Sequence, residues 1–376
     1  MIVPVIAIVI ASVLFIVLII AVVLLVRRVF KKDPATDTST SLITAGLSLV
    51  VSSFPGLKEL VLSGILSHFG VIISTETDAL SIICGVVLIG LGLWLRRDVK
   101  DRIFVLNMYG LYAQRDISDA QAIKDLNLAD FKVKELILDF VDVFKMPMDE
   151  DAHNRIIHKI DKTCEKFTER SRDRKSCFTG MAPIPYTIYA GTKLAGSELR
   201  RYFEYRRADS KYYELSNQKR KKYDALKVRY PSDTKSNAKA NEVLITVSIT
   251  NAIVDADLQQ FGSMEKIDIG LDHPKDNIIV NVNQLDVYCQ EIVKTIEELK
   301  TKYSCLKRVY LAASIPSCVS MELGKKIALN RNRLPEIVSV HYMNSMTPKY
   351  PFGVVVSGDN ESYGQMIDMQ NEAAVV

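Results

Sequence analysis

Two short stretches carry hydroxyl side chains where a buried strand is expected to give way to a helix. The first, Ser248-Ile249-Thr250, ends the apolar run EVLITVSIT. The second, Ser314-Ile315-Pro316-Ser317, follows LKRVYLAA and opens the helical pattern CVSMELGKK. A helix N-terminus offers free backbone N–H groups and the positive end of its dipole, and both favour phosphate binding. A proline in the first turn costs the helix no hydrogen bond. The junctions are therefore candidate anion sites, although serine here also serves as a simple cap.

The sequence lacks the motifs of the common cofactor, nucleotide-hydrolysis and metal sites. There is no G-x-G-x-x-G and no phosphate loop with a lysine, so neither dinucleotide cofactors nor nucleoside-triphosphate hydrolysis are expected. The six cysteines form no C-x-x-C pair, and His153 and His158 are five residues apart, off a common helical face. We therefore predict no cofactor, no metal site and no catalytic residue. The net charge of +4 is too small to indicate a nucleic-acid polymer as partner.

The second half of the chain alternates strands with helices around the two junctions. Strands are expected at Glu242–Thr250, Leu306–Ala313, Glu336–Met343 and Tyr350–Val356, and a strand-like start at Ile278 leads into a long amphipathic helix ending at Tyr303. This alternation predicts a mostly parallel sheet covered by helices. In such sheets a ligand binds beyond the carboxyl ends of the strands, which is where the hydroxyl junctions lie.

The sequence between the N-terminal part and these strands predicts both helices and strands. It predicts a strand at Lys134–Phe144, a helix at His153–Arg170, a basic turn at SRDRKS and a bent strand at Arg201–Leu215. The tail from Asp359 is polar and is expected to be loose.

The N-terminal part has the composition of a membrane domain. Met1–Val26 contains no charged residue, and as a helix it would be about 39 Å long, more than the ~30 Å hydrocarbon core. It lacks the basic start and short apolar core of a cleaved signal peptide. Further apolar blocks cover residues 41–73, broken at Pro55, and 79–95. Glycines at 64, 70, 85, 90 and 92 allow close helix packing.

Basic clusters give this region an orientation. Arg27–Lys32 and Arg96–Lys100 flank the second and third blocks, and the acidic turn Ser74–Asp78 separates them. The positive-inside rule places both basic clusters in the cytoplasm. The favoured arrangement has the N-terminus outside, three crossings and a cytoplasmic C-terminal part. The alternative is two spans with a re-entrant middle block.

Five stretches occur in the order expected of a SAVED domain. They are GMAPIPYTIYAGTKLAG, YFEYRR, LITVSIT, VYLAASIPSCVSMELGKK and VHYMN…YPFGVVV. Residues 178–358 therefore resemble the SAVED sensors of bacterial antiphage signalling (CBASS), which look like two fused CARF-type Rossmann-like units. The chain as a whole resembles a transmembrane SAVED effector. The layout is a transmembrane domain at 1–97, a juxtamembrane coupling region at 98–177, the sensor at 178–358 and a tail at 359–376.

The resemblance implies a cyclic di- or trinucleotide as ligand and no enzymatic activity. Serine-bearing junctions and helix starts suit its phosphates, while tyrosine and arginine can stack on its bases. The candidate ligand contacts are Pro185, Tyr186, Tyr205, Arg206, Ser248, Thr250, Asn251, Ser314, Pro316, Ser317 and Tyr342. SKYYEL stands where relatives often carry an aromatic W-x-W, which leaves the pairing of that strand open.

Three functions compete at this level. In the favoured one, the ligand drives homo-oligomerisation, the spans disrupt the bacterial inner membrane, and the cell stops growing or dies in an abortive infection. A cyclic-oligonucleotide synthase is then the functional partner. The second is a ring nuclease using Ser314, Lys325 and Lys326, and the third is a passive anchored receptor that recruits another effector.

Overall fold

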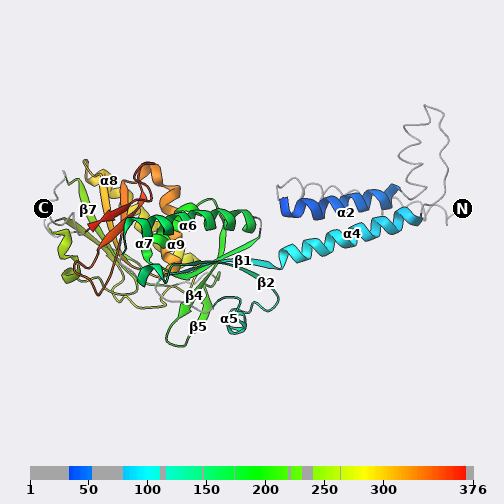
Figure 1. Ribbon diagram of the computed structural model, residues 1–376, viewed down its shortest axis with the longest axis horizontal. Helices are drawn as coiled ribbons and strands as arrows, with labels where there is room; N and C mark the ends of the chain where they lie inside the picture. The colour runs from blue at the N-terminus through cyan, green and yellow to red at the C-terminus, as the bar shows by residue number, and fades with distance from the viewer. Residues whose placement is uncertain are drawn as a thin grey trace, which may run out of the picture. The chain divides into compact units, whose positions relative to one another are not determined.

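The computed structural model describes residues 34–52, 79–110, 116–145, 148–172, 174–218, 222–230, 240–262 and 264–369. Contacts divide the chain into two compact units, one formed by residues 1–102 with 172–174 and the other by 103–171 with 175–376. Figure 1 shows the helices of the first unit and the mixed helices and strands of the second.

Two helices make up the described part of the first unit, α2 (Pro34–Ser52) and α4 (Ala79–Lys100). They pack closely because small residues face the contact: an ideal Cβ at Gly85 would lie 2.6 Å from the Gly46 carbonyl oxygen, and one at Gly92 would lie 2.7 Å from the Ser39 carbonyl oxygen. This confirms the predicted packing role of Gly85 and Gly92, whereas Gly90 has open space beside it.

None of the helices in the described part of the chain combines the length with the hydropathy that a membrane crossing needs. The crossing expected at 79–95 falls on α4, so this finding does not support it. The expected span at 2–26 and residues 53–73 of the middle block lie outside the described residues.

The second unit contains two sheets. The first has the order β2-β1-β3-β4-β5 and the second the order β12-β11-β10-β9-β7-β8-β6. The strands of the first are β1 (Arg102–Tyr109), β2 (Lys132–Asp139), β3 (Lys175–Met181), β4 (Leu199–Arg206) and β5 (Lys211–Glu214). Those of the second are β6 (Lys227–Arg229), β7 (Glu242–Ser248), β8 (Glu265–Gly270), β9 (Arg308–Ser314), β10 (Glu336–His341), β11 (Phe352–Ser357) and β12 (Met366–Asp368).

Both sheets have a parallel centre, and antiparallel strands lie at one edge of the first sheet and at both edges of the second. The strands β1, β3 and β4 run parallel, as do β8, β7, β9 and β10, while β5, β6, β11 and β12 pair antiparallel to their neighbours. This is the mostly parallel α/β architecture that the sequence predicts. The segment expected to be a coupling region supplies β1 and β2, so it is built into the first sheet.

The helices of this unit are α5 (Ala120–Asp125), α6 (Glu150–Ser171), α7 (Ile184–Lys193), α8 (Val282–Lys302) and α9 (Ser317–Leu329), with 3-10 turns η1 (Val143–Lys145), η2 (Asp255–Phe261) and η3 (Arg331–Arg333). The expected strand-like start of α8 is present as an isolated parallel bridge between Asn281 and Ser216. Asn281 is also the N-cap, and its side chain accepts hydrogen bonds from the backbone N–H groups of Asn283 and Gln284 at 2.7 and 3.4 Å.

Helices α7 and α9 hold the two sheets together. Helix α7 packs on β10 and β11 of the second sheet, α9 packs on β3 and β4 of the first, and the two helices contact each other. At their crossing, an ideal Cβ on Gly191 would lie 3.0 Å from the Cα of Gly324. Backbones can approach this closely only where side chains are absent.

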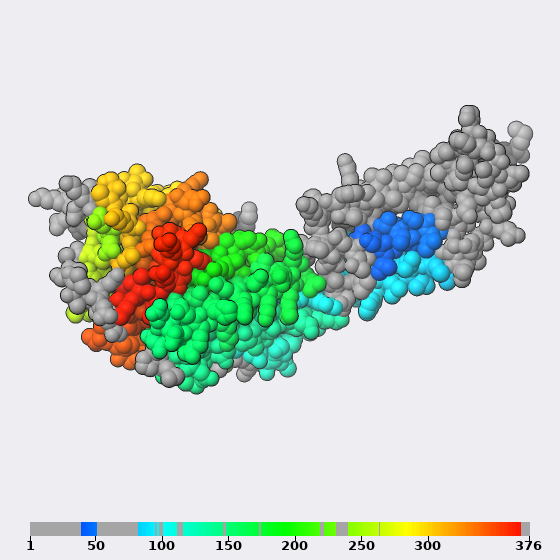
Figure 2. All heavy atoms as spheres, turned by 45° about the horizontal axis from the view of Figure 1, so that its top comes forward, coloured from blue at the N-terminus to red at the C-terminus, as the bar shows by residue number. Residues whose placement is uncertain are grey.

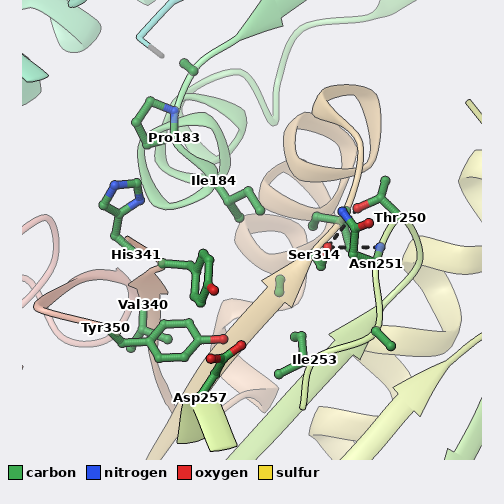
Figure 3. Close-up of a pocket in the computed structure, with 15 residues that line it drawn as sticks. Pro183, Ile184, Thr250, Asn251, Ile253, Asp257, Ser314, Val340, His341 and Tyr350 are labelled. Atoms are coloured by element: carbon green, nitrogen blue, oxygen red, sulfur yellow. Dashed lines mark hydrogen bonds between the residues drawn. The ribbon is translucent and has the colours of Figure 1, made fainter. Parts of the chain in front are cut away.

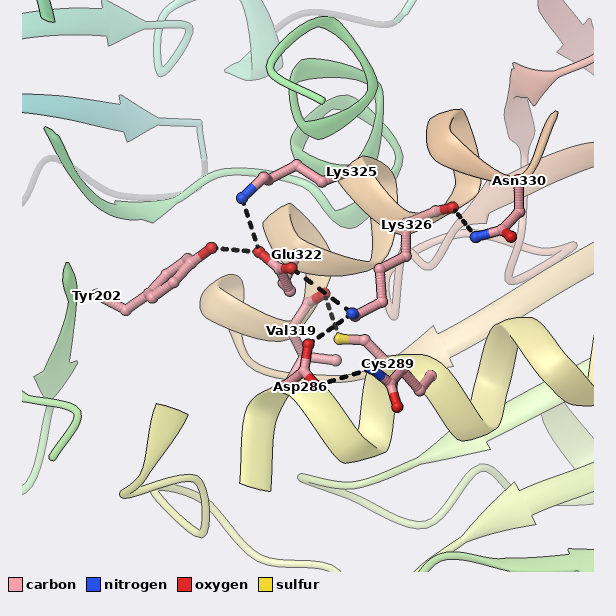
Figure 4. Close-up of polar contacts among 9 residues, drawn as sticks. Tyr202, Asp286, Cys289, Val319, Glu322, Lys325, Lys326 and Asn330 are labelled. Carbon is pink, nitrogen blue, oxygen red and sulfur yellow. Dashed lines mark hydrogen bonds and ion pairs between the residues drawn. The ribbon is translucent and has the colours of Figure 1, made fainter. Parts of the chain in front are cut away.

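A half-buried polar network ties α9 to its neighbours (Figure 4). The Glu322 carboxylate accepts hydrogen bonds from the Tyr202 hydroxyl on β4 and, at 3.1 Å, from Lys325 Nζ. Lys326 Nζ donates to Asp286 of α8 at 2.6 Å. Of the two lysines that a ring nuclease would need, Lys325 is therefore engaged within α9 and Lys326 is engaged with α8.

The C-terminal segment is ordered, which contradicts the expected loose tail. Residues 359–365 form a turn and β12 follows, and Figure 2 shows this red segment on the surface beside the green residues of α6. His153 Nε2 donates to the Gly364 carbonyl oxygen at 2.8 Å. The Tyr363 ring stacks on Tyr189 at 5.2 Å and receives Lys193 Nζ over its face at 4.8 Å. Residues 370–376 lie outside the described residues.

Candidate functional site

A pocket of about 390 Å³ opens beyond the carboxyl ends of β7, β9 and β10 (Figure 3). The turn between β3 and α7 forms one wall, and η2 with the segment before β11 forms another. Its lining residues are Ala182, Pro183, Ile184, Thr250, Asn251, Ala252, Ile253, Asp257, Ala313, Ser314, Ile315, Val340, His341, Tyr342 and Tyr350. Both sheets contribute, and the volume falls within the ~300–1,000 Å³ of small-molecule sites.

A pair of hydroxyl groups lies at one side of the pocket. Ser314 Oγ and Thr250 Oγ1 are 2.8 Å apart, and the backbone N–H of Asn251 donates to Ser314 Oγ at 3.1 Å. The pair forms because β7 and β9 are parallel neighbours with Ser248 opposite Ser314, so the residues after each strand meet. The backbone N–H groups of Ile249 and Thr250 also donate to the Ser314 carbonyl oxygen, each at 2.9 Å. These bonds use the N–H groups of Ile249, Thr250 and Asn251 within the protein, so the two hydroxyls are the groups that this side of the pocket offers to a ligand.

Aromatic rings form the opposite side. Tyr342 is 40% exposed, and its ring lies 5.4 Å from that of Tyr350 at 63°. His341 is buried, which lowers its pKa to about 4 and keeps the imidazole neutral at pH 7. The exposed face of Tyr342 is available to stack on a flat ligand.

Among the described residues that line the pocket, Asp257 is the one with a charged side chain. A lysine or arginine that neutralises a phosphate must therefore come from outside the lining set. Lys275 is a candidate, because its backbone N–H donates to the carbonyl oxygen of Ile249, the residue before Thr250, at 3.1 Å and its side chain is exposed.

A family model named "SMODS-associated and fused to various effectors sensor domain" (SAVED) matches residues 160–356. The match covers more than half of the 376 residues. The chain belongs to the SAVED family. The matched region begins within α6 and ends in β11, so it includes every lining residue of the pocket. No curated protein matches the chain by sequence.

Solved structures with a similar fold include SAVED/CARF-domain receptors called Cap4. Acinetobacter baumannii Cap4 with the cyclic trinucleotide 3′3′3′-cAAA is 15% identical, with a TM-score of 0.45 over 83% of this chain and 65% of that one. Its complex with 2′3′3′-cAAA is 15% identical in sequence, with a TM-score of 0.46 over 83% of this chain and 65% of that one. Moraxella osloensis Cap4 is 16% identical in sequence, with a TM-score of 0.42 over 78% of this chain and 63% of that one. This chain thus spans less than two thirds of each Cap4 chain.

Within the SAVED unit, four of the predicted contacts line one pocket: Thr250, Asn251, Ser314 and Tyr342. Ser248 lies just behind it, where its hydroxyl accepts a hydrogen bond from the Ile253 backbone N–H at 3.1 Å and shapes the loop. The junction pattern therefore located the pocket, because parallel neighbouring strands bring their carboxyl ends together.

Pro185 and Tyr186 do not line this pocket, since α7 turns both side chains into the core. Tyr186 is fully buried, and its hydroxyl lies 2.9 Å from His153 Nδ1. Because His153 Nε2 donates to a carbonyl oxygen, Nδ1 is the acceptor, and burial lowers the pKa of this neutral histidine. The preceding residues of the same motif, Pro183 and Ile184, are the ones that reach the pocket.

Tyr205 and Arg206 also lie outside the pocket lining, at the end of β4. The Tyr205 ring packs on Tyr212 at 5.0 Å. The Arg206 guanidinium lies over the Tyr213 ring at 5.4 Å and pairs with Asp209 at 3.1 Å. Strand β4 pairs with β5 in a hairpin, which resolves the expected bent strand into two.

The start of α9 is occupied by a side chain of the protein itself, which corrects the expected phosphate site. Pro316 is the N-cap residue, and the Ser317 hydroxyl donates to the Gly180 carbonyl oxygen at 2.6 Å. The backbone N–H of Cys318 donates to Glu204 Oε1 at 2.6 Å. Burial raises the pKa of Glu204 to about 7, although the bond from Cys318 counteracts part of the rise.

We expect Glu204 to make stability depend on pH. Its pKa is about 7 in the folded protein against a reference of 4.5, so the native state retains a proton that the unfolded chain releases between these values. The free energy of unfolding should therefore fall as pH rises from 4.5 to 7. In Glu204→Gln, chemical denaturation should show this fall reduced by up to about 3 kcal/mol.

Glu198→Gln is the matched control, because Glu198 is exposed and should leave the pH dependence unchanged. Identical pH profiles for the wild type and Glu204→Gln would mean that Glu204 is already ionised throughout this range.

The pocket also contains residues that the sequence did not single out: Asp257, His341 and Tyr350. Tyr350 N–H and carbonyl oxygen are bonded to the side chain of Gln260 at 2.9 and 2.8 Å. This contact joins residues 90 positions apart and brings η2 to the pocket. No local spacing could have indicated it.

A second, larger cavity of about 1,260 Å³ lies elsewhere in the second unit, and none of the predicted contacts lines it. It lies between η1 with the start of α6 and the segments that flank β11. Four methionines line it together with His153: Met148, Met343, Met346 and Met366.

Proposed function

We propose that this chain is a receptor for a cyclic di- or trinucleotide second messenger in CBASS antiphage signalling, and that the ligand binds in the pocket at Ser314. The observation that carries the proposal is the position of this pocket. It lies beyond the carboxyl ends of parallel strands in a chain of the SAVED family, and both sheets contribute to it. Ligands of open α/β sheets bind at such places.

The pocket chemistry fits part of a nucleotide ring. The Ser314 and Thr250 hydroxyls are 2.8 Å apart, so one donates to the other and the second can donate to a phosphate or ribose oxygen. Tyr342, which is 40% exposed, can stack on a base. With about 390 Å³ available, the pocket suits one nucleoside portion while the rest of the ring lies at the rim near Lys275.

We further propose that the N-terminal region is the effector. Met1–Val26 has no charged residue, and α4 exposes Ile83, Val86, Val87, Leu91, Leu93 and Trp94 by 47 to 63%. Exposed apolar surface of this kind marks an interaction site. Ligand binding drives homo-oligomerisation, the assembled N-terminal regions breach the inner membrane, and the infected cell stops growing or dies. The synthase that makes the messenger is the functional partner.

The energy for assembly is the difference in the ligand's affinity for the assembled and unassembled states. The receptor therefore needs no covalent chemistry. Lys325 and Lys326, which a ring nuclease would use beside Ser314, are bonded to Glu322 and Asp286 and are absent from the pocket lining.

The ligand proposal is tested by a thermal-shift screen of the full chain against cyclic di- and trinucleotides, including 3′3′3′-cAAA. A ligand at a hundred times its Kd stabilises the folded state by about 2.7 kcal/mol, so a true ligand raises the melting temperature by several degrees. Linear nucleotides of the same composition are the control. If no cyclic oligonucleotide stabilises the chain, the ligand proposal is wrong.

The effector proposal is tested with the full chain in dye-loaded liposomes. The ligand found above should first increase the oligomer mass measured by light scattering and then release the dye. Tight binding that changes neither mass nor dye retention contradicts the effector role. Dye release that requires a second protein would instead identify a passive receptor.

A further inference from the structure

Asp257 places a carboxylate at the pocket with no cation to balance it. It is the one charged side chain among the described lining residues, and none of the ion pairs between described residues includes it. Its neighbour Asp255, in the same 3-10 turn, pairs with Lys266 at 2.6 Å. Figure 3 shows the Asp257 carboxylate beside the hydroxyl end of Tyr350, across the pocket from Ser314 and Asn251.

The carboxylate is held in place by the packing of η2. Gln260, three residues later, makes two hydrogen bonds with the backbone of Tyr350, at 2.8 and 2.9 Å. The Phe261 ring packs on Tyr350 at 5.7 Å and on Tyr310 at 5.9 Å. Leu258, next to Asp257, is buried. The position of the carboxylate relative to the aromatic wall is therefore fixed before a ligand arrives.

This arrangement restricts what a nucleotide can present to Asp257. A carboxylate is purely an acceptor and repels phosphate oxygens, so the ligand must offer hydrogen-bond donors. Guanine is the base with two adjacent donors on one edge, the N1–H and the N2 amino group. These match the two oxygens of a carboxylate in the bidentate geometry that is strongest for charged pairs. Adenine presents an acceptor, N1, beside its amino group, which a carboxylate disfavours.

We propose that Asp257 selects guanine: a guanine base enters the pocket between Tyr342 and Ile184 and donates two hydrogen bonds to the Asp257 carboxylate. The inference rests on the proposed function, since it specifies a base of the cyclic oligonucleotide. It predicts a ligand that contains at least one guanine. A good bidentate contact to a base discriminates by ~1–3 kcal/mol, which corresponds to an affinity ratio of roughly 5 to 150.

The test compares two cyclic trinucleotides of the same 3′3′3′ linkage, one with three adenines and one with two adenines and one guanine. Isothermal titration calorimetry on the full chain should show tighter binding of the guanine-containing ligand by at least about fivefold. In Asp257→Asn this preference should disappear or reverse, because an asparagine amide offers one donor and one acceptor and so matches adenine.

Asp255→Asn is the matched control: it removes a neighbouring carboxylate whose partner is Lys266 and should keep the guanine preference. Melting temperatures of the ligand-free variants check that η2 remains folded. Equal affinity of the wild type for both trinucleotides, or an equal loss of both in Asp257→Asn, overturns the inference while the receptor function stands. A failure of every cyclic oligonucleotide to bind overturns both.

Discussion

Gly324→Ala should strongly destabilise the second unit, because the added methyl group has no space between α7 and α9. An ideal Cβ at position 324 would overlap the Ile188 carbonyl oxygen and lie 3.0 Å from the Cα of Gly191. These are backbone atoms of α7, so no flexible side chain can yield, and the two helices must separate. Overpacking of this kind costs about 3 kcal/mol. Thermal unfolding of the ligand-free protein should show a melting temperature lower by roughly 10 °C.

The same substitution should also weaken ligand binding. Helix α7 begins at the pocket residue Ile184, and α9 begins three residues after Ser314, so a change at their contact moves two walls of the pocket. Gly196→Ala is the control, because an ideal Cβ there meets no atom within 4 Å. A Gly324→Ala protein that melts within a degree of the wild type would show that the α7–α9 contact is looser than the structure has it.

The contact between Gly191 and Gly324 gives a physical reason for the glycine in each of two sequence motifs. Gly191 ends the stretch APIPYTIYAG, and Gly324 ends VSMELG. The resemblance to SAVED domains rests largely on these two elements, and in the structure their glycines meet where one sheet's helix crosses the other's. The pattern was visible in the sequence, but the contact was not, because the two positions are far apart in the chain.

The sequence predicted strands best where the apolar residues form a continuous run. The continuous apolar runs of β7 and β9 predicted strands of a mostly parallel sheet. The structure makes these two strands neighbours, and this pairing brings Thr250 and Ser314 together. No strand was predicted at β8, although EKIDIG alternates polar and apolar residues over six positions, a pattern that favours a strand. Strand β3 begins with Lys175 and Ser176, which read as the end of a basic turn.

Long-range contacts account for the remaining differences. The local sequence around the PIP turn allowed Tyr186 to face a ligand. In the structure its hydroxyl instead forms a hydrogen bond with His153 of α6 in the core. The polar segment after Asp359 is ordered because Arg331 Nε donates to the Gly358 carbonyl oxygen at 2.9 Å and Tyr363 packs on Tyr189. Each partner lies outside the segment, so composition could not reveal it.

Ser314→Leu should abolish ligand binding without unfolding the protein. The substitution removes the hydroxyl that pairs with Thr250 and accepts from Asn251, and it places a branched side chain in a pocket of about 390 Å³. Ser314 is half-buried at the end of β9, so a larger side chain can extend into the pocket rather than into the core. Calorimetry should show an affinity lower by at least about 100-fold, a loss of ~3 kcal/mol.

Two comparisons make this result specific. Ser314→Ala removes the hydroxyl while leaving the pocket open, and it should weaken binding by only about tenfold, as expected for one hydrogen bond. Ser304→Leu adds the same side chain at an exposed position outside the pocket and should bind as the wild type does. Full affinity in Ser314→Leu would place the ligand elsewhere. The cavity of about 1,260 Å³ beside Met148 and Met346 would then be the next site to block.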